Sequence, residues 1–153
     1  MASERDRDRE LKDPDDGYFP PGTVHEDVYY SFNGMDFVWD KAKSDRCYQD
    51  RGFDFRVAAH VFNDKDCIFN TDDKHSILED RESVIGIPTE EGVSGSGPES
   101  AIEDVVIGGV DDILFVVFTE RMTYDGSDYI RIISARFADK KEEEKYYKNK
   151  NSF

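Results

Sequence analysis

The sequence contains few cysteines and no long hydrophobic run. Only Cys47 and Cys67 occur among its 153 residues, and they form neither a CxxC motif nor a metal-ligand spacing. We therefore expect two reduced thiols rather than a disulfide framework. No apolar stretch approaches the roughly 20 residues of a membrane-spanning helix. No hydrophobic segment of a secretory signal follows the N-terminus, so a cytoplasmic location without a membrane partner is the expectation.

The sequence also lacks the excess of basic charge that is typical of proteins that coat nucleic acids. It has 35 acidic and 20 basic residues, for a net charge of −15. Any contact with RNA would therefore need a local basic patch on an acidic body. Residues 129–153 hold seven basic and four acidic residues, which places such a patch near the C-terminus.

Aromatic residues are abundant, with 11 Phe and 8 Tyr, and the length suits one domain with a modest core. Residues 1–34 hold nine acidic and four basic residues, and they include turn and polyproline chemistry. We expect a largely disordered tail there, although its aromatic residues leave docking of a part of it open. The domain is expected over residues 35–153, with a flexible, Gly/Ser-rich insertion at 88–104.

Local signals predict the order β-α-α-β-β-β-β-α. A strand over 35–39 is followed by a helix that Asp40 caps and Gly52 ends, and Asp54 caps a second helix. Asp-Gly in "TYDGSD" predicts a hairpin turn. Asp139 caps a last helix, and the whole pattern indicates an α+β fold with an antiparallel sheet.

Five stretches in the same order resemble the BrnT toxins, which are the toxin halves of bacterial type II toxin–antitoxin pairs. They are "FVWDKAK", "RGFDFRVAAHVFND", "HSILEDRESVIG", "FTER" and "IRIISARFADKKEEEKYY", and they cover about Met35 to Tyr147. The resemblance implies a RelE-like fold, with two N-terminal helices on one face of an antiparallel sheet and a C-terminal helix. Two features depart from the family: "CYQDRG" at the end of the first helix, and the insertion.

The resemblance also implies a function. The expected activity is that of a metal-independent RNA endonuclease that blocks translation, acts on mRNA either free or on the ribosome, and needs no cofactor. A BrnA-like antitoxin would neutralise it, and DNA would be contacted only through that antitoxin. The alternative is a non-catalytic, BrnT-like protein-binding module, which the acidic body, the altered "CYQDRG" and the acidic loop favour.

The motif "VIG" occurs twice, at Val84–Gly86 and at Val106–Gly108. The first copy has Arg81 at the spacing from Ile85 that resembles the family. The second copy has a family-like distance to "ILFVV". We favour the first copy as the strand, which leaves the second as an extra half-strand or an alternative register.

Arginines on the last two strands are the main candidates for a phosphate site. Side chains alternate along a strand, so Arg131 should point away from the face that carries Ile130 and Ile132. Arg121 shares a face with Thr119, and the hairpin would bring Arg121 near Arg131. Two guanidinium groups there could bind a phosphate through paired hydrogen bonds. The alternative is that each arginine pairs with a carboxylate nearby.

The resemblance supplies the other candidate site residues. Glu142 is expected as a base, Tyr146 as a stacking group or proton donor, and His75 as the histidine with a catalytic context. The further expected contacts to RNA phosphate are Arg136, Lys140 and Lys141. The alternative is that Tyr146 packs on the sheet and that Glu142 pairs with a lysine one helical turn away. No metal-ligand spacing surrounds His75.

Overall fold

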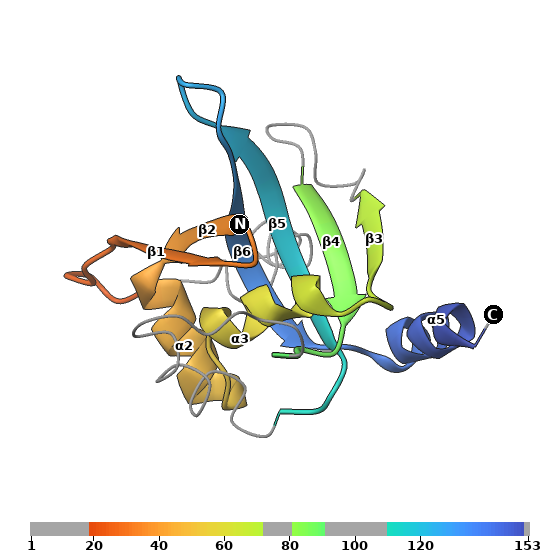
Figure 1. Cartoon of the computed structure of the whole chain (residues 1–153). Coiled ribbons are helices and arrows are strands. Elements are labelled where there is room, and N and C mark those ends of the chain that lie inside the picture. The colour runs from red at the N-terminus through yellow and green to blue at the C-terminus, as the bar shows by residue number, and fades with distance from the viewer. Residues whose placement is uncertain (1–18, 72–80, 91–109, 152–153) are drawn as a thin grey trace, which may run out of the picture.

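The computed structural model describes residues 19–71, 81–90 and 110–151. Figure 1 shows a central sheet with helices beside it. The strands are β1 (Asp27–Phe32), β2 (Met35–Asp40), β3 (Ile68–Thr71), β4 (Arg81–Gly86), β5 (Leu114–Met122) and β6 (Asp128–Phe137). The helices are α2 (Lys41–Arg51), α3 (Phe55–Ala59), the 3-10 helix η2 (His60–Asn63) and α5 (Lys140–Lys150). The predicted α+β class is therefore confirmed.

The six strands form one mixed sheet in the order β1-β2-β6-β5-β4-β3. All neighbouring pairs are antiparallel except β2 and β6, which run parallel, with Phe37 opposite Ile130 and Trp39 opposite Ile132. The prediction of a purely antiparallel sheet was therefore wrong. A parallel pair joins strands that are far apart in the sequence, so no local turn motif predicts it.

The sheet also begins earlier than expected. β1 lies within the predicted tail and pairs with β2 along its whole length, from Asp27 opposite Asp40 to Phe32 opposite Met35. Asn33 and Gly34 connect the two strands with φ values of 49° and 77°, as a two-residue type I′ hairpin requires. The expected domain start at Met35 is thus too late, because Phe32 is buried in the core. Residues 1–18 of the expected tail lie outside the described residues.

The predicted helix caps are confirmed. The Asp40 carboxylate accepts a hydrogen bond from Lys43 N at the start of α2, and Gly52 ends that helix with a φ of 88°. Asp54 accepts from the first turn of α3. Asp139 and Glu142 form a reciprocal capping box at the start of α5, which satisfies backbone N–H groups that have no partner within the helix.

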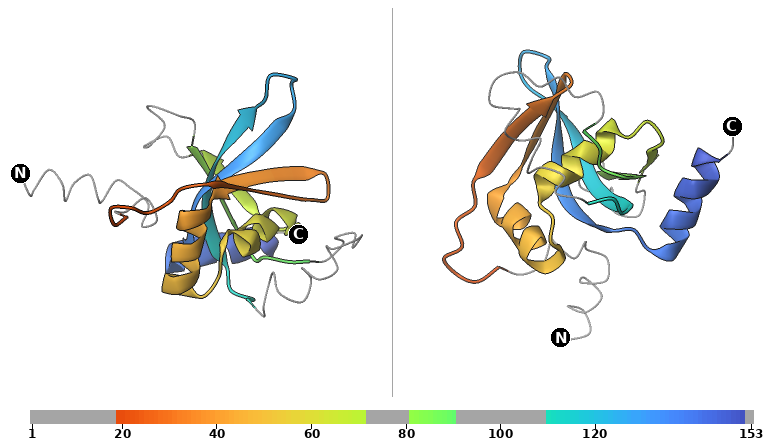
Figure 2. Two further views of the ribbon diagram at one scale, coloured as in Figure 1. Left: turned by 90° about the vertical axis from the view of Figure 1, so that its left-hand side faces the viewer. Right: turned by 60° about the horizontal axis from the view of Figure 1, so that its bottom comes forward.

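Hydrophobic side chains form two clusters on opposite faces of the sheet. The larger one joins Trp39, Phe55 and Phe118 with other residues of α2, α3 and the central strands. The smaller one joins Ile85, Ile113 and Tyr146. Val84 belongs to the first cluster and its neighbour Ile85 to the second, as the alternation of side chains along a strand demands. The right view of Figure 2 shows α2 and α3 together on one side, with α5 apart from them.

The first "VIG" copy forms part of β4, which pairs with both β3 and β5. Packing around its Gly86 is tight, because a Cβ atom there would lie 3.0 Å from Asp64 Oδ2 and from Cys67 Cβ, closer than most such contacts. Of the predicted insertion, Pro88 to Glu90 are described, and Pro88 is buried. Residues 91–104 and the second copy lie outside the described residues.

Candidate functional site

Three arginines lie on neighbouring strands around Thr119. Strand register places Arg81 of β4 and Arg131 of β6 directly opposite Thr119 of β5, one on each side. Directly opposite residues share a face of the sheet. Arg121, two residues beyond Thr119 on β5, lies on that face as well. This arginine row (Arg81, Arg121 and Arg131) lies on the face of the sheet opposite the larger cluster, since Ile85 on the same face of β4 belongs to the smaller cluster.

Thr119 lies between the arginines of the row and is held in place by burial. Its side chain is buried, although a hydroxyl is uncommon in that environment. Arg121 Nε donates to Thr119 Oγ1 over 3.0 Å, so the threonine fixes part of the longer and more exposed arginine side chain. The surrounding face is less open than the sequence predicted, because Val117 and Ser134 on it are also buried.

Arg131 donates through Nη2 to Asp27 Oδ1 of β1 over 3.1 Å. The arginine and aspartate side chains are 32% and 44% exposed, and ion pairs of such exposure contribute only about 0–1 kcal/mol. A stronger anion can therefore replace this carboxylate. Pairing of Arg131 with a carboxylate is the predicted alternative to phosphate binding, but the partner comes from the segment expected to lie outside the domain.

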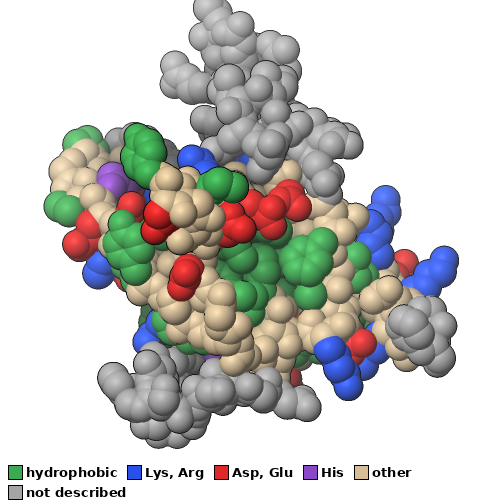
Figure 3. Space-filling view, turned by 45° about the horizontal axis from the view of Figure 1, so that its top comes forward, with side chains coloured by type: hydrophobic (Ala, Val, Ile, Leu, Met, Phe, Trp, Pro, Cys, Tyr) green, Lys and Arg blue, Asp and Glu red, His purple; other side chains and the backbone are tan. Residues whose placement is uncertain are grey.

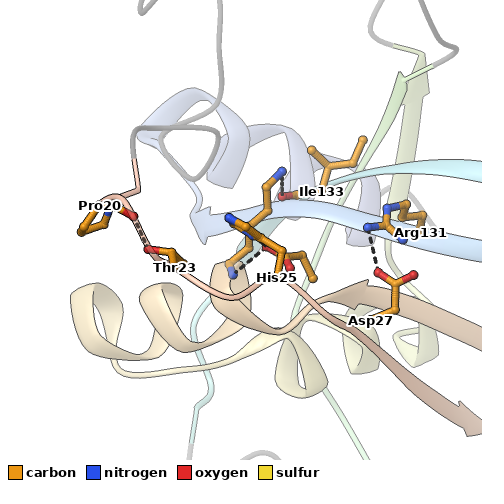
Figure 4. Close-up of polar contacts among 8 residues, drawn as sticks. Pro20, Thr23, His25, Asp27, Arg131 and Ile133 are labelled. Carbon is orange, nitrogen blue, oxygen red and sulfur yellow. Dashed lines mark hydrogen bonds and ion pairs between the residues drawn. The ribbon is translucent and has the colours of Figure 1, made fainter.

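Arg131 borders a surface cavity next to the start of α2. Its other polar lining residues are His25, Glu26, Asp27, Asp40 and Lys43. His25 Nδ1 lies 2.8 Å from Asp40 Oδ2, and Lys43 Nζ lies 3.5 Å from the carbonyl oxygen of Ile133 on β6. Figure 4 shows His25, Asp27 and Arg131 near one another, with the turn between Pro20 and Thr23 beside them.

Arg136 and Glu142 are engaged with each other and not with the arginine row. Arg136 donates to both Glu142 carboxylate oxygens, at 2.9 and 3.0 Å, and its guanidinium lies 4.2 Å from the centre of the Phe115 ring. Glu142 also accepts from Asp139 N. Five residues of extended strand separate Arg136 from Arg131, which is roughly 16 Å. The structure thus makes Glu142 part of the cap of α5 and pairs it with Arg136, whereas the base and phosphate contact remain predictions.

Tyr146 is part of the core. It is 1% exposed, and its hydroxyl donates to Asp64 Oδ2 over 2.6 Å. Burial, followed by the bond to Asp64, raises the pKa of Tyr146 far above its ordinary value. It therefore packs as the alternative interpretation had it, and the predicted stacking on an RNA base is wrong.

The remaining candidates are less informative. Lys140 and Lys141 are exposed in the first turn of α5, which follows the end of β6 that carries Arg136. His75 lies outside the described residues. Within residues 19–71, 81–90 and 110–151, no group of three His, Cys, Asp or Glu side chains could hold a metal ion. No helix among those residues is long and apolar enough to cross a membrane.

Sequence reasoning missed Arg81, His25, Asp40 and Lys43 as site residues. Arg81 was noted for its spacing, but only the β4–β5 register places it beside Thr119. Asp40 was identified as a helix cap without a second role. An available signal for His25 was Asn33-Gly34, because that hairpin brings the preceding segment back along β2 toward Asp40.

The comparisons with known proteins give no match: neither a protein-family model nor a curated protein is similar to this chain. The resemblance to the BrnT toxins therefore stays a prediction.

Proposed function

We propose that this protein binds RNA phosphate through its arginine row and cleaves RNA as the toxin of a type II toxin–antitoxin pair. The observation that carries the proposal is the placement of Arg81, Arg121 and Arg131 around Thr119 on one face. Guanidinium groups bind phosphate oxygens through paired, charge-assisted hydrogen bonds. Three of them on neighbouring strands, which lie about 4.8 Å apart, concentrate positive charge on one face of the sheet.

The chemistry proposed needs no metal. The ribose 2′-oxygen attacks the adjacent phosphorus, and negative charge grows on the phosphoryl oxygens and on the leaving 5′-oxygen. Fixed cations placed where that charge develops are the largest contribution that a protein can make. Arg121, held by Thr119, is pre-oriented for this purpose. The proposed fold is RelE-like, with two N-terminal helices on one face of the sheet and α5 after the last strand.

The charge of the whole chain limits how RNA can approach. With a net charge of −15, most of the surface repels phosphate, so binding should be local and strongly dependent on salt. On the face in Figure 3, hydrophobic side chains gather centrally with Asp and Glu around them. An antitoxin that binds such a surface would present basic and apolar side chains. We propose a BrnA-like antitoxin of this kind as the partner in the cytoplasm.

The second candidate is a non-catalytic module that binds a protein partner. The Arg131–Asp27 ion pair favours this second candidate, because the Arg131 guanidinium already binds a carboxylate. An acidic peptide could then take the place of Asp27 without any cleavage of RNA.

Growth arrest on induced expression in a bacterium separates the two candidates. The wild-type chain should arrest growth and Arg131→Ala should not. The matched control is Arg56→Ala, since Arg56 is 36% exposed and pairs with Asp54 on the α3 side of the molecule. Arrest by all three proteins at equal expression would contradict the role of Arg131. Growth without arrest by the wild-type chain would favour the binding module.

A further inference from the structure

We infer that His25, oriented by Asp40, is the proton-accepting base of the RNA site, and that Asp27 occupies the place of the substrate phosphate. This inference rests on the proposed function and names a catalytic residue for it. His25 and Asp27 belong to the N-terminal segment, which the sequence analysis had assigned to the tail.

The first support is the geometry of the His25–Asp40 pair. Asp40 is 7% exposed and its Oδ2 atom accepts from both Lys43 N, at 3.3 Å, and His25 Nδ1, at 2.8 Å. A carboxylate held as a helix cap cannot swing away, so it fixes the imidazole with the proton on Nδ1. Nε2 is then the basic atom. Histidine is the side chain most often used for proton transfer in enzymes, and in the Ser-His-Asp triad a carboxylate orients it.

The second support is the position of the pair beside Arg131. His25, Asp27, Asp40, Lys43 and Arg131 line one cavity. Asp27 lies opposite Asp40 in the β1–β2 ladder, so its carboxylate bridges the space between the histidine pair and the guanidinium. Its oxygen on Arg131 Nη2, at 3.1 Å, stands in for a phosphoryl oxygen. A substrate phosphate that displaces it would present its ribose to the His25 side of the cavity.

The third support is the setting of the imidazole itself. The Phe19 ring meets it edge to face with the centroids 5.1 Å apart, and the Arg46 guanidinium lies over the Phe19 ring at 4.5 Å from its centre. The imidazole is therefore held from two directions, by Asp40 and by Phe19, while half of its side-chain surface stays accessible. The charged groups that face it are Glu26, Asp27, Asp40, Lys43 and Arg131.

The proposed step balances without a further reactant. His25 Nε2 takes the proton of the ribose 2′-hydroxyl, the bond from that oxygen to phosphorus forms, and the bond from phosphorus to the 5′-oxygen breaks. The leaving 5′-oxygen takes a proton from water, and the imidazolium returns its proton to the solvent. The products are a 2′,3′-cyclic phosphate and a 5′-hydroxyl, with no net change in protons.

Single-turnover cleavage of an RNA oligonucleotide by the full chain tests this inference. For His25→Gln we expect a rate lower by about 100-fold or more, the usual contribution of such a base. Asp40→Asn keeps the helix cap and should lower the rate less. A 2′-O-methyl oligonucleotide, which cannot be cleaved, should bind His25→Gln as tightly as wild type, and Asp27→Asn more tightly.

The outcomes distinguish the inference from the function on which it rests. A His25→Gln protein with the wild-type rate, beside an inactive Arg131→Ala protein, would overturn the role of His25 and leave the proposed function standing. A wild-type chain that never cleaves RNA would overturn both. A thermal melt of each variant shows whether a loss of rate reflects a loss of fold.

Discussion

Single buried polar residues fix the way in which the helices dock on the sheet. The Asp64 carboxylate, at the end of η2, accepts from Tyr146 of α5, from Ile87 N and from Asp66 N. Three donors on one buried carboxylate satisfy most of its hydrogen-bonding capacity. Asp64 therefore ties α5 and the end of β4 to the 3-10 helix.

Tyr146→Phe should destabilise the fold by about 1–3 kcal/mol, because the change leaves the buried Asp64 carboxylate without one of its donors. The matched control is Tyr147→Phe, since Tyr147 is its neighbour and is 48% exposed. Urea denaturation measures both. Equal midpoints for the two variants would show that the Tyr146 hydroxyl contributes nothing to stability.

His60 predicts how stability depends on pH. It is 1% exposed, with Nδ1 at 3.0 Å from Thr89 O and Nε2 at 2.7 Å from the Tyr30 hydroxyl. Nδ1 donates to the carbonyl, so Nε2 accepts from Tyr30. Burial is the main cause that lowers the pKa of His60 below its ordinary value of 6.5. The unfolded chain therefore takes up the proton first as the pH falls.

The stabilising effect of neutral His60 is thus complete above about pH 6.5 and is lost progressively as the pH falls from there toward the lower pKa of the folded state. The free energy of unfolding, measured in urea between pH 7.5 and 5, should fall more steeply for the wild type than for His60→Asn. Tyr30→Phe keeps the histidine and should retain the steep dependence. Parallel curves for wild type and His60→Asn would contradict this account.

At the scale of the elements, β1 is a part of the sheet and not of a tail. Phe32 stacks on His60 with ring centres 4.1 Å apart, and Tyr30 contacts Trp39. Removal of residues 1–34 would expose these partners and leave β2 as an unprotected edge. We expect a loss of roughly 3 kcal/mol or more from the exposed aromatic surface alone.

A deletion series tests the place of β1. The protein without residues 1–18 should melt close to the full-length chain, and the protein without residues 1–34 should melt well below it. Differential scanning calorimetry at equal concentration gives both values. Equal melting temperatures for the two truncations would mean that β1 adds nothing to the fold, as expected of a largely disordered tail.

Local signals were sufficient for the caps and for one hairpin. Asp40, Asp54 and Asp139 each precede a helix as predicted, because capping depends only on the residue and its next three neighbours. The turn at Asp125-Gly126 is local in the same way, with Gly126 at a φ of 88°. Asn33-Gly34 carries the same kind of signal, but it falls in a segment whose charge had suggested a tail.

Long-range pairing could not be predicted from the sequence. Nothing near Val38 indicates that it lies opposite Arg131 in a parallel ladder. The prediction that Arg121 and Arg131 share a face agrees with the register, since both lie on the side of Thr119. Arg81 lies beside them only because β4 pairs with β5. Arg136 is not part of this group, because it pairs with Glu142 at the start of α5. These relations depend on which strands become neighbours.

At the scale of the whole molecule, the acidic charge and the arginine row oppose each other. Five lysines on α5 lie far from the row along the sheet, so the positive groups near the proposed site are few. RNA affinity should therefore depend on individual arginines, and the loss of one should be visible in the salt dependence of binding.

The most direct test is the binding of a single-stranded 2′-O-methyl oligonucleotide to wild type, Arg131→Ala and Arg56→Ala over a range of salt. For Arg131→Ala the account predicts about ten-fold or more weaker binding, since a charge-assisted hydrogen bond contributes roughly 1.5–3 kcal/mol. It also predicts a slope of log affinity against log salt that is shallower by roughly 0.7, the value for one phosphate contact in a single strand. Arg56→Ala should match the wild type in both. A folded Arg131→Ala protein with the affinity and slope of the wild type would contradict the claim that the arginine row binds RNA phosphate.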